Sequence, residues 1–128
     1  MTRALADTSL FIARESGRRL AEVDLPDELA ISVITLGELR AGVLAAADIS
    51  TRDRRLATLV EALTFDAVPI DQSVAEMWAR LRVLLHDAGR RMPVNDSWIA
   101  ATAMMLGVPV VTQDDNYLEV AGLLVIRV

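Results

Sequence analysis

Four acidic side chains in separate parts of the chain have the residue type and the setting to share one chemical task. Asp7 follows a short apolar run, and Asp114 follows the apolar segment 110–112. Glu38 stands early in an apolar helical stretch, and Asp96 begins another. An isolated buried carboxylate is costly, so acids carried towards the interior cap helices or share a cation. The pattern therefore indicates a site for a hard divalent cation, which takes oxygen ligands.

Each of these acids also has an ordinary structural interpretation. Asp7 and Asp96 stand where side chains cap the N-termini of helices. The segment Thr35-Leu-Gly-Glu38 fits the capping box, in which the glutamate accepts a hydrogen bond from the threonine's backbone N–H. Asp114 belongs to a polar turn, where acids are common. The functional interpretation depends on whether the four segments meet.

The composition removes most other catalytic chemistries. The 128 residues include no cysteine and a single histidine, His86, which excludes thiolate sites and disfavours a Ser–His pair. All 13 basic residues are arginine, so neither a P-loop lysine nor a Schiff-base lysine exists. The net charge of −5 opposes nucleic-acid binding unless a cation neutralises clustered acids locally. The 18 acidic residues remain as the main chemical resource.

Apolar periodicity predicts one α/β domain over residues 1–128, with a mainly parallel central sheet of about five strands. Ligands of such sheets bind beyond the carboxyl ends of the strands, and the four acids are delivered to that edge. The predicted strands cover residues 3–7, 28–32, 64–68, 110–112 and 123–128, and the predicted helices cover 10–19, 35–46, 51–63, 71–88 and 96–106.

The chain carries no pattern that predicts export or membrane insertion. Its first residues lack the charged and then apolar segments of a signal peptide. No apolar run reaches the roughly 20 residues that a membrane span needs. We therefore expect a cytoplasmic protein without a membrane segment.

Four short motifs, in this order, resemble those of PIN-domain proteins and, more narrowly, of the VapC toxins of bacterial toxin–antitoxin systems. They are Ala-Asp-Thr-Ser at 6–9, Ser-Val-Ile-Thr-Leu-Gly-Glu-Leu at 32–39, Asn-Asp-Ser-Trp-Ile-Ala-Ala at 95–101 and Val-Thr-Gln-Asp at 111–114. The resemblance implies a PIN-like three-layer sandwich, with helices on both faces of the sheet. It also implies a Mg²⁺- or Mn²⁺-dependent endoribonuclease.

The catalytic residues of that family would map onto Asp7, Glu38, Asp96 and Asp114. Asp7, Asp96 and Asp114 would bind the metal ion, and a metal-activated water would hydrolyse an RNA phosphodiester. Water attack of this kind leaves 5′-phosphate and 3′-hydroxyl ends.

Supporting roles fall to four residues: Ser9, Thr112, Asp115 and Asn116. Ser9 and Thr112 match small polar residues of the family beside the first and last acids. Many relatives carry an aspartate where this chain has Asn116, so Asp114 and Asp115 both remain candidates for the last acid. The spacing from Thr112 favours Asp114.

Two arginines, Arg90 and Arg91, precede the Asp96 motif and are candidates for contact with a phosphate of the substrate. The resemblance also implies a cognate VapB-like antitoxin, because an unrestrained ribonuclease is toxic, and a homodimer. The apolar helices between residues 36 and 63 offer surface for either partner.

Two other functions compete with this interpretation. A PIN-fold module that has lost its chemistry would bind RNA or protein without cleaving, although all four acidic positions are occupied. An α/β phosphoryl-transfer enzyme would also gather acids at strand ends. A phosphorelay receiver needs a lysine that the chain lacks, and the phosphatases that use an aspartate nucleophile begin with Asp-x-Asp where this chain has Asp7-Thr8-Ser9.

Overall fold

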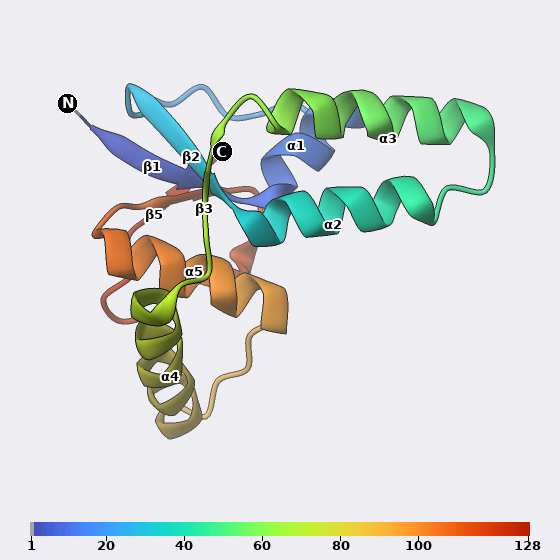
Figure 1. Cartoon of the computed structure of the whole chain (residues 1–128). Helices are drawn as coiled ribbons and strands as arrows, with labels where there is room; N and C mark the ends of the chain where they lie inside the picture. Colours follow the sequence, from blue (N-terminus) through green and yellow to red (C-terminus); the bar gives the residue numbers. More distant parts are fainter. Residues whose placement is uncertain (1) are drawn as a thin grey trace.

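The computed structural model describes residues 2–128 and contains one central sheet (Figure 1). The strands lie in the order β3–β2–β1–β4–β5, and every neighbouring pair is parallel. This confirms the predicted α/β class and the parallel sheet of five strands. The strands are β1 (Arg3–Ala6), β2 (Glu28–Ser32), β3 (Asp66–Val68), β4 (Val110–Thr112) and β5 (Val125–Arg127).

Helices cover both faces of the sheet, as the three-layer prediction requires. Their bounds are α1 (Thr8–Glu15), α2 (Val33–Leu44), α3 (Ile49–Ala62), α4 (Gln72–Asp87) and α5 (Val94–Leu106), with a short 3₁₀ helix η1 (Asp115–Tyr117) after β4. Alternate side chains of β1 enter two separate cores, because successive side chains of a strand point to opposite faces. Leu5 packs with α4 and α5, whereas Ala4 and Ala6 pack with α1, α2 and α3.

Helices α2 and α3 form a hairpin that extends away from the sheet (Figure 1). Of the apolar stripe along α3, Leu59 is buried, with 2% of its surface exposed. On the same helix Val60 is 55% exposed, and the C-cap residue Leu63 is 56% exposed. Exposed apolar side chains therefore lie on this hairpin, together with the exposed charged residues Arg52, Asp53 and Arg54. Within residues 2–128, no helix has the length and apolar character that crossing a membrane requires.

Helix α2 begins two residues before its predicted start at Thr35, and the predicted capping box is wrong. Ser32 is the N-cap, and its hydroxyl accepts a hydrogen bond from the backbone N–H of Ile34 at 3.0 Å. Thr35 lies inside the helix, fully buried, and its hydroxyl contacts Thr8 of α1 instead. The Glu38 carboxylate consequently takes no part in capping α2.

The helices that carry the first and third acids also differ from their predicted starts. Asp7 is the N-cap of α1, which begins at Thr8 and ends at Glu15 instead of covering 10–19. Asp96 does not cap α5, because Pro93 occupies the N-cap position and Asp96 lies in the first helical turn. A carboxylate in the first turn still interacts favourably with the helix dipole.

Candidate active site

Asp7 stands at the carboxyl end of the central strand β1 and is 1% exposed. The Tyr117 hydroxyl donates to its Oδ1 at 2.8 Å. The Thr112 hydroxyl donates to its Oδ2 at 2.9 Å, and the Ser9 backbone N–H approaches the same oxygen at 3.4 Å. Three donors therefore fix the carboxylate, and Oδ1 keeps an acceptor site beyond the one that Tyr117 uses.

Hydroxyl groups join the end of β4 to the start of α1. Because the single proton of the Thr112 hydroxyl goes to Asp7, the Ser9 hydroxyl donates in the 3.2 Å contact between Ser9 and Thr112. The backbone N–H of Asp114 donates to the Thr112 oxygen at 2.9 Å, and that of Gln113 donates to the Ser9 oxygen at 3.0 Å. Ser9 and Thr112, both predicted as supporting residues, thus set the backbone that carries Asp114.

Glu38 reaches the same region from the first half of α2. The Thr8 hydroxyl donates to its Oε1 at 2.7 Å. Since that donation uses the only hydroxyl proton of Thr8, Thr35 donates in the 2.9 Å contact between the two threonines. Glu38 is held by a chain of two buried hydroxyls. Thr8 has no assigned role in the sequence interpretation, because its partners lie 27 and 30 residues away.

Asp96 is half-buried and accepts a hydrogen bond from the Asn116 side-chain amide at 2.9 Å. Burial raises the pKa of its carboxyl to about 6, and the negative charges of Asp7 and Asp114 add to that rise. The hydrogen bond from Asn116 acts in the opposite direction. Asp96, Asp7 and Asp114 are therefore close enough to repel one another.

Asp114 and Asp115, adjacent in sequence, have different surroundings. Burial and the charge of Asp7 raise the pKa of Asp114, although Arg18 and Arg127 oppose the shift. Asp115 is exposed and forms an ion pair with Arg127 at 3.1 Å. Of these two adjacent acids, Asp114 is the one whose pKa the charge of Asp7 raises.

Tyr117 is the site residue whose role sequence reasoning missed. Its ring is fully buried, and burial together with the charges of Asp7 and Asp96 raises the pKa of its hydroxyl. It therefore stays a neutral hydrogen-bond donor. An aromatic residue after a polar turn gave a sequence signal for core packing, but none for a hydrogen bond that spans 110 residues.

The donor set fits a hard divalent cation. Within residues 2–128, no three Asp, Glu, His or Cys side chains stand close enough to hold one ion among themselves. Mg²⁺ does not need three, because it is commonly bound through one or two carboxylates and keeps several waters. Asp7, Asp96 and Asp114 repel one another electrostatically, which a cation between them would relieve.

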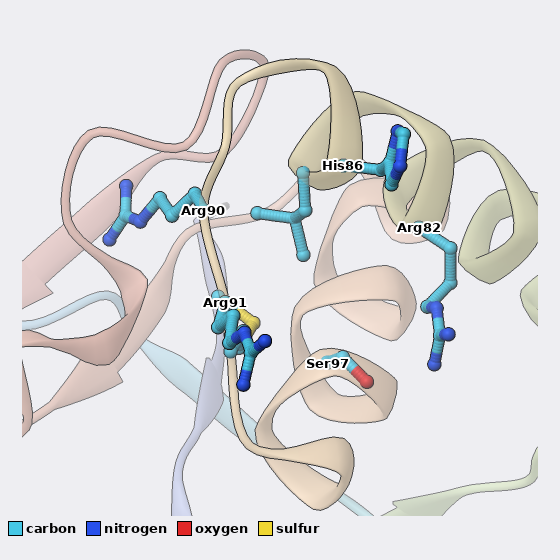
Figure 2. A pocket seen from close by; sticks show the side chains of 7 residues that line it. Arg82, His86, Arg90, Arg91 and Ser97 are labelled. Carbon is cyan, nitrogen blue, oxygen red and sulfur yellow. The ribbon is translucent and has the colours of Figure 1, made fainter.

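Arg90 and Arg91 lie at the edge of a separate pocket between α4 and α5 (Figure 2). Their side chains extend to different sides of the loop that joins the two helices. Arg90 donates to the backbone carbonyl of Asn116 at 3.3 Å, so it ties this loop to η1. The Arg91 side chain extends towards Ser97.

In a comparison with known families, residues 4–123 match the PIN domain. The chain belongs to the PIN-domain family. Within that family it groups with the VapC proteins. Ribonuclease VapC5 of Mycobacterium tuberculosis is 52% identical over 116 residues, which cover 91% of this chain and 86% of that protein. Ribonuclease VapC4 of the same organism is 45% identical over 126 residues, which cover 98% and 97%.

Solved structures give the same grouping. A chain in the crystal structure of VapBC-5, a member of the VapBC family of toxin–antitoxin systems from Mycobacterium tuberculosis, is 45% identical to this chain. It superimposes with a TM-score of 0.91 and covers 100% of both chains. VapBC2 from Rickettsia felis, at 18% identity and a TM-score of 0.81 over 98% of both chains, shares the fold.

Proposed function

We propose that this chain is the toxin of a toxin–antitoxin pair and acts in the cytoplasm as a Mg²⁺- or Mn²⁺-dependent endoribonuclease. The observation that carries the proposal is the meeting of Asp7, Asp96 and Asp114 beyond the carboxyl edge of a parallel sheet. Hydrogen bonds from Thr112, Tyr117 and Asn116 hold two of these acids there, and Thr112 also accepts from the backbone N–H of Asp114. Relatives that are 52% and 45% identical are named ribonucleases, which supports the reaction class.

Asp7, Asp96 and Asp114 would hold the cation together, in part through the water molecules that Mg²⁺ retains. When bound, the cation would lower the pKa of water and offset negative charge on the scissile phosphate. Asp7 supplies a carboxylate whose orientation Tyr117 and Thr112 fix before any ligand arrives. Such preorganisation avoids the cost of ordering the group during the reaction.

Glu38 completes the site by accepting protons or orienting the attacking water. Thr8 occupies only one acceptor position of its carboxylate, so the remaining positions stay available for a water molecule. A carboxylate within hydrogen-bond reach of that water can act as a general base. Neither histidine nor lysine is needed for this chemistry, which agrees with their scarcity in the sequence.

The proposal includes an antitoxin and a second copy of the chain as partners. The matched structure of VapBC-5 comes from a toxin–antitoxin system. The exposed apolar face of α3, with Val60 and Leu63, provides surface that association would cover.

Incubation of the purified protein with total RNA, in Mg²⁺ or in EDTA, tests the reaction. We expect cleavage in Mg²⁺ only, 5′-phosphate and 3′-hydroxyl ends, and no cleavage by the Asp7→Ala variant. A 2′,3′-cyclic phosphate end would contradict the water mechanism. Equal RNA binding without cleavage by the parent and by Asp7→Ala would support a binding module instead.

Asp114 and Asp115 provide a matched pair for the same assay. Each of the variants Asp114→Asn and Asp115→Asn removes one acid from adjacent positions of the chain. We expect Asp114→Asn to lose cleavage, because this side chain faces Asp7. We expect Asp115→Asn to keep it, because Asp115 pairs with Arg127 at the surface. The reverse outcome would assign the last acid of the site to Asp115.

A further inference from the structure

Positive charge gathers in one pocket of this acidic protein. The pocket has a volume of about 280 Å³ and lies between α4 and the start of α5. Arg82 and Arg91 extend towards it, with Ser97 between them, and His86 stands at its rim (Figure 2). No acidic side chain lines it. With a net charge of −5 on the whole chain, this local excess of arginine indicates an anionic ligand.

Arg82 is held in place without using its hydrogen-bond donors. Its guanidinium carbon lies 5.0 Å from the centre of the Trp78 ring, in a cation–π contact. In the described part of the chain, no carboxylate lies within ion-pair distance of Arg82 or Arg91. Both guanidinium groups therefore keep the donor geometry that matches a phosphate group.

Two stacked tryptophans are connected to the pocket through its lining residue Ser97. Trp78 stacks on Trp98, with the ring centres 4.2 Å apart and the planes 3° from parallel. The indole N–H of Trp78 donates to the Ser97 hydroxyl at 3.0 Å, and that hydroxyl donates to the backbone carbonyl of Val94. The Ser97 hydroxyl is thus engaged with Trp78 and Val94, which leaves recognition of an anion to the two arginines.

The pocket adjoins the acid cluster. Ser97 follows Asp96 directly on α5. Arg90, at the pocket edge, donates to the carbonyl of Asn116, whose side chain donates to Asp96. Two hydrogen bonds therefore connect the pocket wall with a carboxylate of the proposed cation site.

We propose that Arg82 and Arg91 form a subsite for an RNA backbone phosphate next to the scissile one. This inference rests on the ribonuclease function proposed above. The acid cluster repels every phosphate that no cation neutralises, so the substrate needs positive charge close to the site of cleavage. The arginine pocket supplies this positive charge to a backbone phosphate and not to a base. It would therefore position the RNA strand without selecting its sequence.

The test compares the Arg82→Ala/Arg91→Ala double variant with Arg80→Ala, using a single-stranded RNA oligonucleotide that the parent protein cleaves. Arg80 is the matched control, because it lies on the same helix but pairs with Glu76 outside the pocket. We expect the double variant to raise KM at least roughly tenfold with kcat unchanged, and Arg80→Ala to leave both near parent values. The slope of log KM against log salt concentration should also fall by about one, which corresponds to the loss of one phosphate contact.

Because Arg82→Ala removes packing from Trp78, Arg91→Ala alone provides a second variant. In the described part of the chain the Arg91 side chain makes no hydrogen bond or ion pair that the fold would lose. Arg91→Ala should also raise KM, and its melting temperature should equal that of the parent protein. Equal KM values for the double variant and Arg80→Ala would overturn the subsite. So would an unchanged KM with an altered solution mass, which would assign the pocket to contact between protein chains.

The same assay separates this inference from the proposed function. A parent protein that cleaves no RNA in Mg²⁺ contradicts the ribonuclease proposal itself, whatever the arginine variants do. A parent that cleaves, with a double variant that has parent KM, contradicts the subsite alone. Fluorescence anisotropy measures oligonucleotide binding by the Asp96→Asn protein and by the same protein with Arg82→Ala and Arg91→Ala added. The two arginine substitutions should lower its affinity for the oligonucleotide about as much as they raise KM.

Discussion

Asp96 carries a half-buried carboxylate that accepts a hydrogen bond from Asn116 and faces the charges of Asp7 and Asp114. Burial and these charges favour the protonated form of the carboxyl. At neutral pH, however, which lies above its pKa of about 6, the carboxyl is mostly ionised. The residue therefore opposes folding at neutral pH and favours cation binding there. One side chain thus illustrates the trade between stability and function that active sites commonly show.

Asp96→Asn should abolish cleavage and, in EDTA, stabilise the fold at pH 7.5. The pKa of about 6 lies above the ordinary value of 3.8, so the folded protein binds this proton more tightly than the unfolded chain does. The stability that Asp96 contributes is therefore full below pH 3.8 and is lost as the pH rises through about 6. For a half-exposed group we expect a gain of about 1 kcal/mol in the free energy of unfolding.

Urea unfolding of the parent and the variant at pH 7.5 and below pH 4 measures this difference. The gain should be present at pH 7.5 and absent below pH 4. A variant that is no more stable than the parent at pH 7.5 would contradict the assignment of Asp96 as a carboxylate that the fold disfavours. Addition of Mg²⁺ should stabilise the parent and leave the variant nearly unchanged, because ligand binding stabilises the state that binds.

Tyr117 supplies a second prediction at this scale. Tyr117→Phe removes the donor to Asp7 Oδ1 and leaves that oxygen buried without a protein partner. The free energy of unfolding should fall by about 1–2 kcal/mol in EDTA and by less in saturating Mg²⁺, because a cation can take the place of the lost donor. Urea unfolding under both conditions measures the two values.

Thr102→Val is the matched control for Tyr117→Phe. Thr102 is also fully buried, and its hydroxyl donates to the backbone carbonyl of Trp98 at 2.8 Å, away from Asp7. Its loss should lower stability equally with and without Mg²⁺. Equal sensitivity of both variants to Mg²⁺ would mean that Tyr117 does not act through the cation site.

Among the secondary-structure elements, α2 shows most clearly what local sequence patterns can and cannot predict. Apolar spacing predicted the helix and its inward residues Leu36, Leu39 and Val43. Leu39 and Val43 are buried, and Leu36 is partly buried against the same core. It did not predict the start, because Thr35 and Glu38 satisfy a local capping pattern. Their actual partner is Thr8, on a different helix, so the competing contact is invisible within a window of sequence.

The same limit applies to the site. The strand ends at Asp7 and Asp114 could be predicted, because a parallel sheet brings its carboxyl ends to one edge. The hydrogen bonds that fix Asp7 come from Thr112 and Tyr117, over separations of 105 and 110 residues. Such contacts depend on how β1, β4 and η1 are placed together, which composition and periodicity do not specify.

Ser32→Ala tests the corrected start of α2. The variant removes the N-cap, which should lower the free energy of unfolding by about 1 kcal/mol. Because α2 carries Glu38, fraying of its first turn should also lower kcat beyond the loss of folded protein. Thermal unfolding and cleavage rates of the same preparation give the two quantities.

Asp48→Ala is the control, because Asp48 caps α3 by accepting from the Thr51 backbone N–H at 2.8 Å. It should reduce stability without reducing kcat of the folded fraction. Parent stability for Ser32→Ala, with a destabilised Thr35→Ala, would restore Thr35 as the cap.

At the scale of the whole molecule, the chain combines a well-packed sheet with an apolar surface on the α2–α3 hairpin. Leu44 and Ile49, at the hairpin end, are 71% and 78% exposed. Val60 and Leu63 extend this surface along α3. Exposed side chains contribute little to the stability of one chain, so their apolar character is better explained by association.

Val60→Glu/Leu63→Glu should convert a dimer of this chain into a monomer of 14.0 kDa, the mass of one chain. Two charges on a buried apolar interface are costly, whereas at exposed positions of the monomer they change the stability of the fold by at most about 0.5 kcal/mol each. Light scattering after size-exclusion chromatography gives the mass, and thermal unfolding confirms the fold. Val83→Glu on α4, at a position 61% exposed, is the control and should leave the dimer intact. Persistence of the dimer in the double variant would place the interface elsewhere and leave the α3 face to the antitoxin.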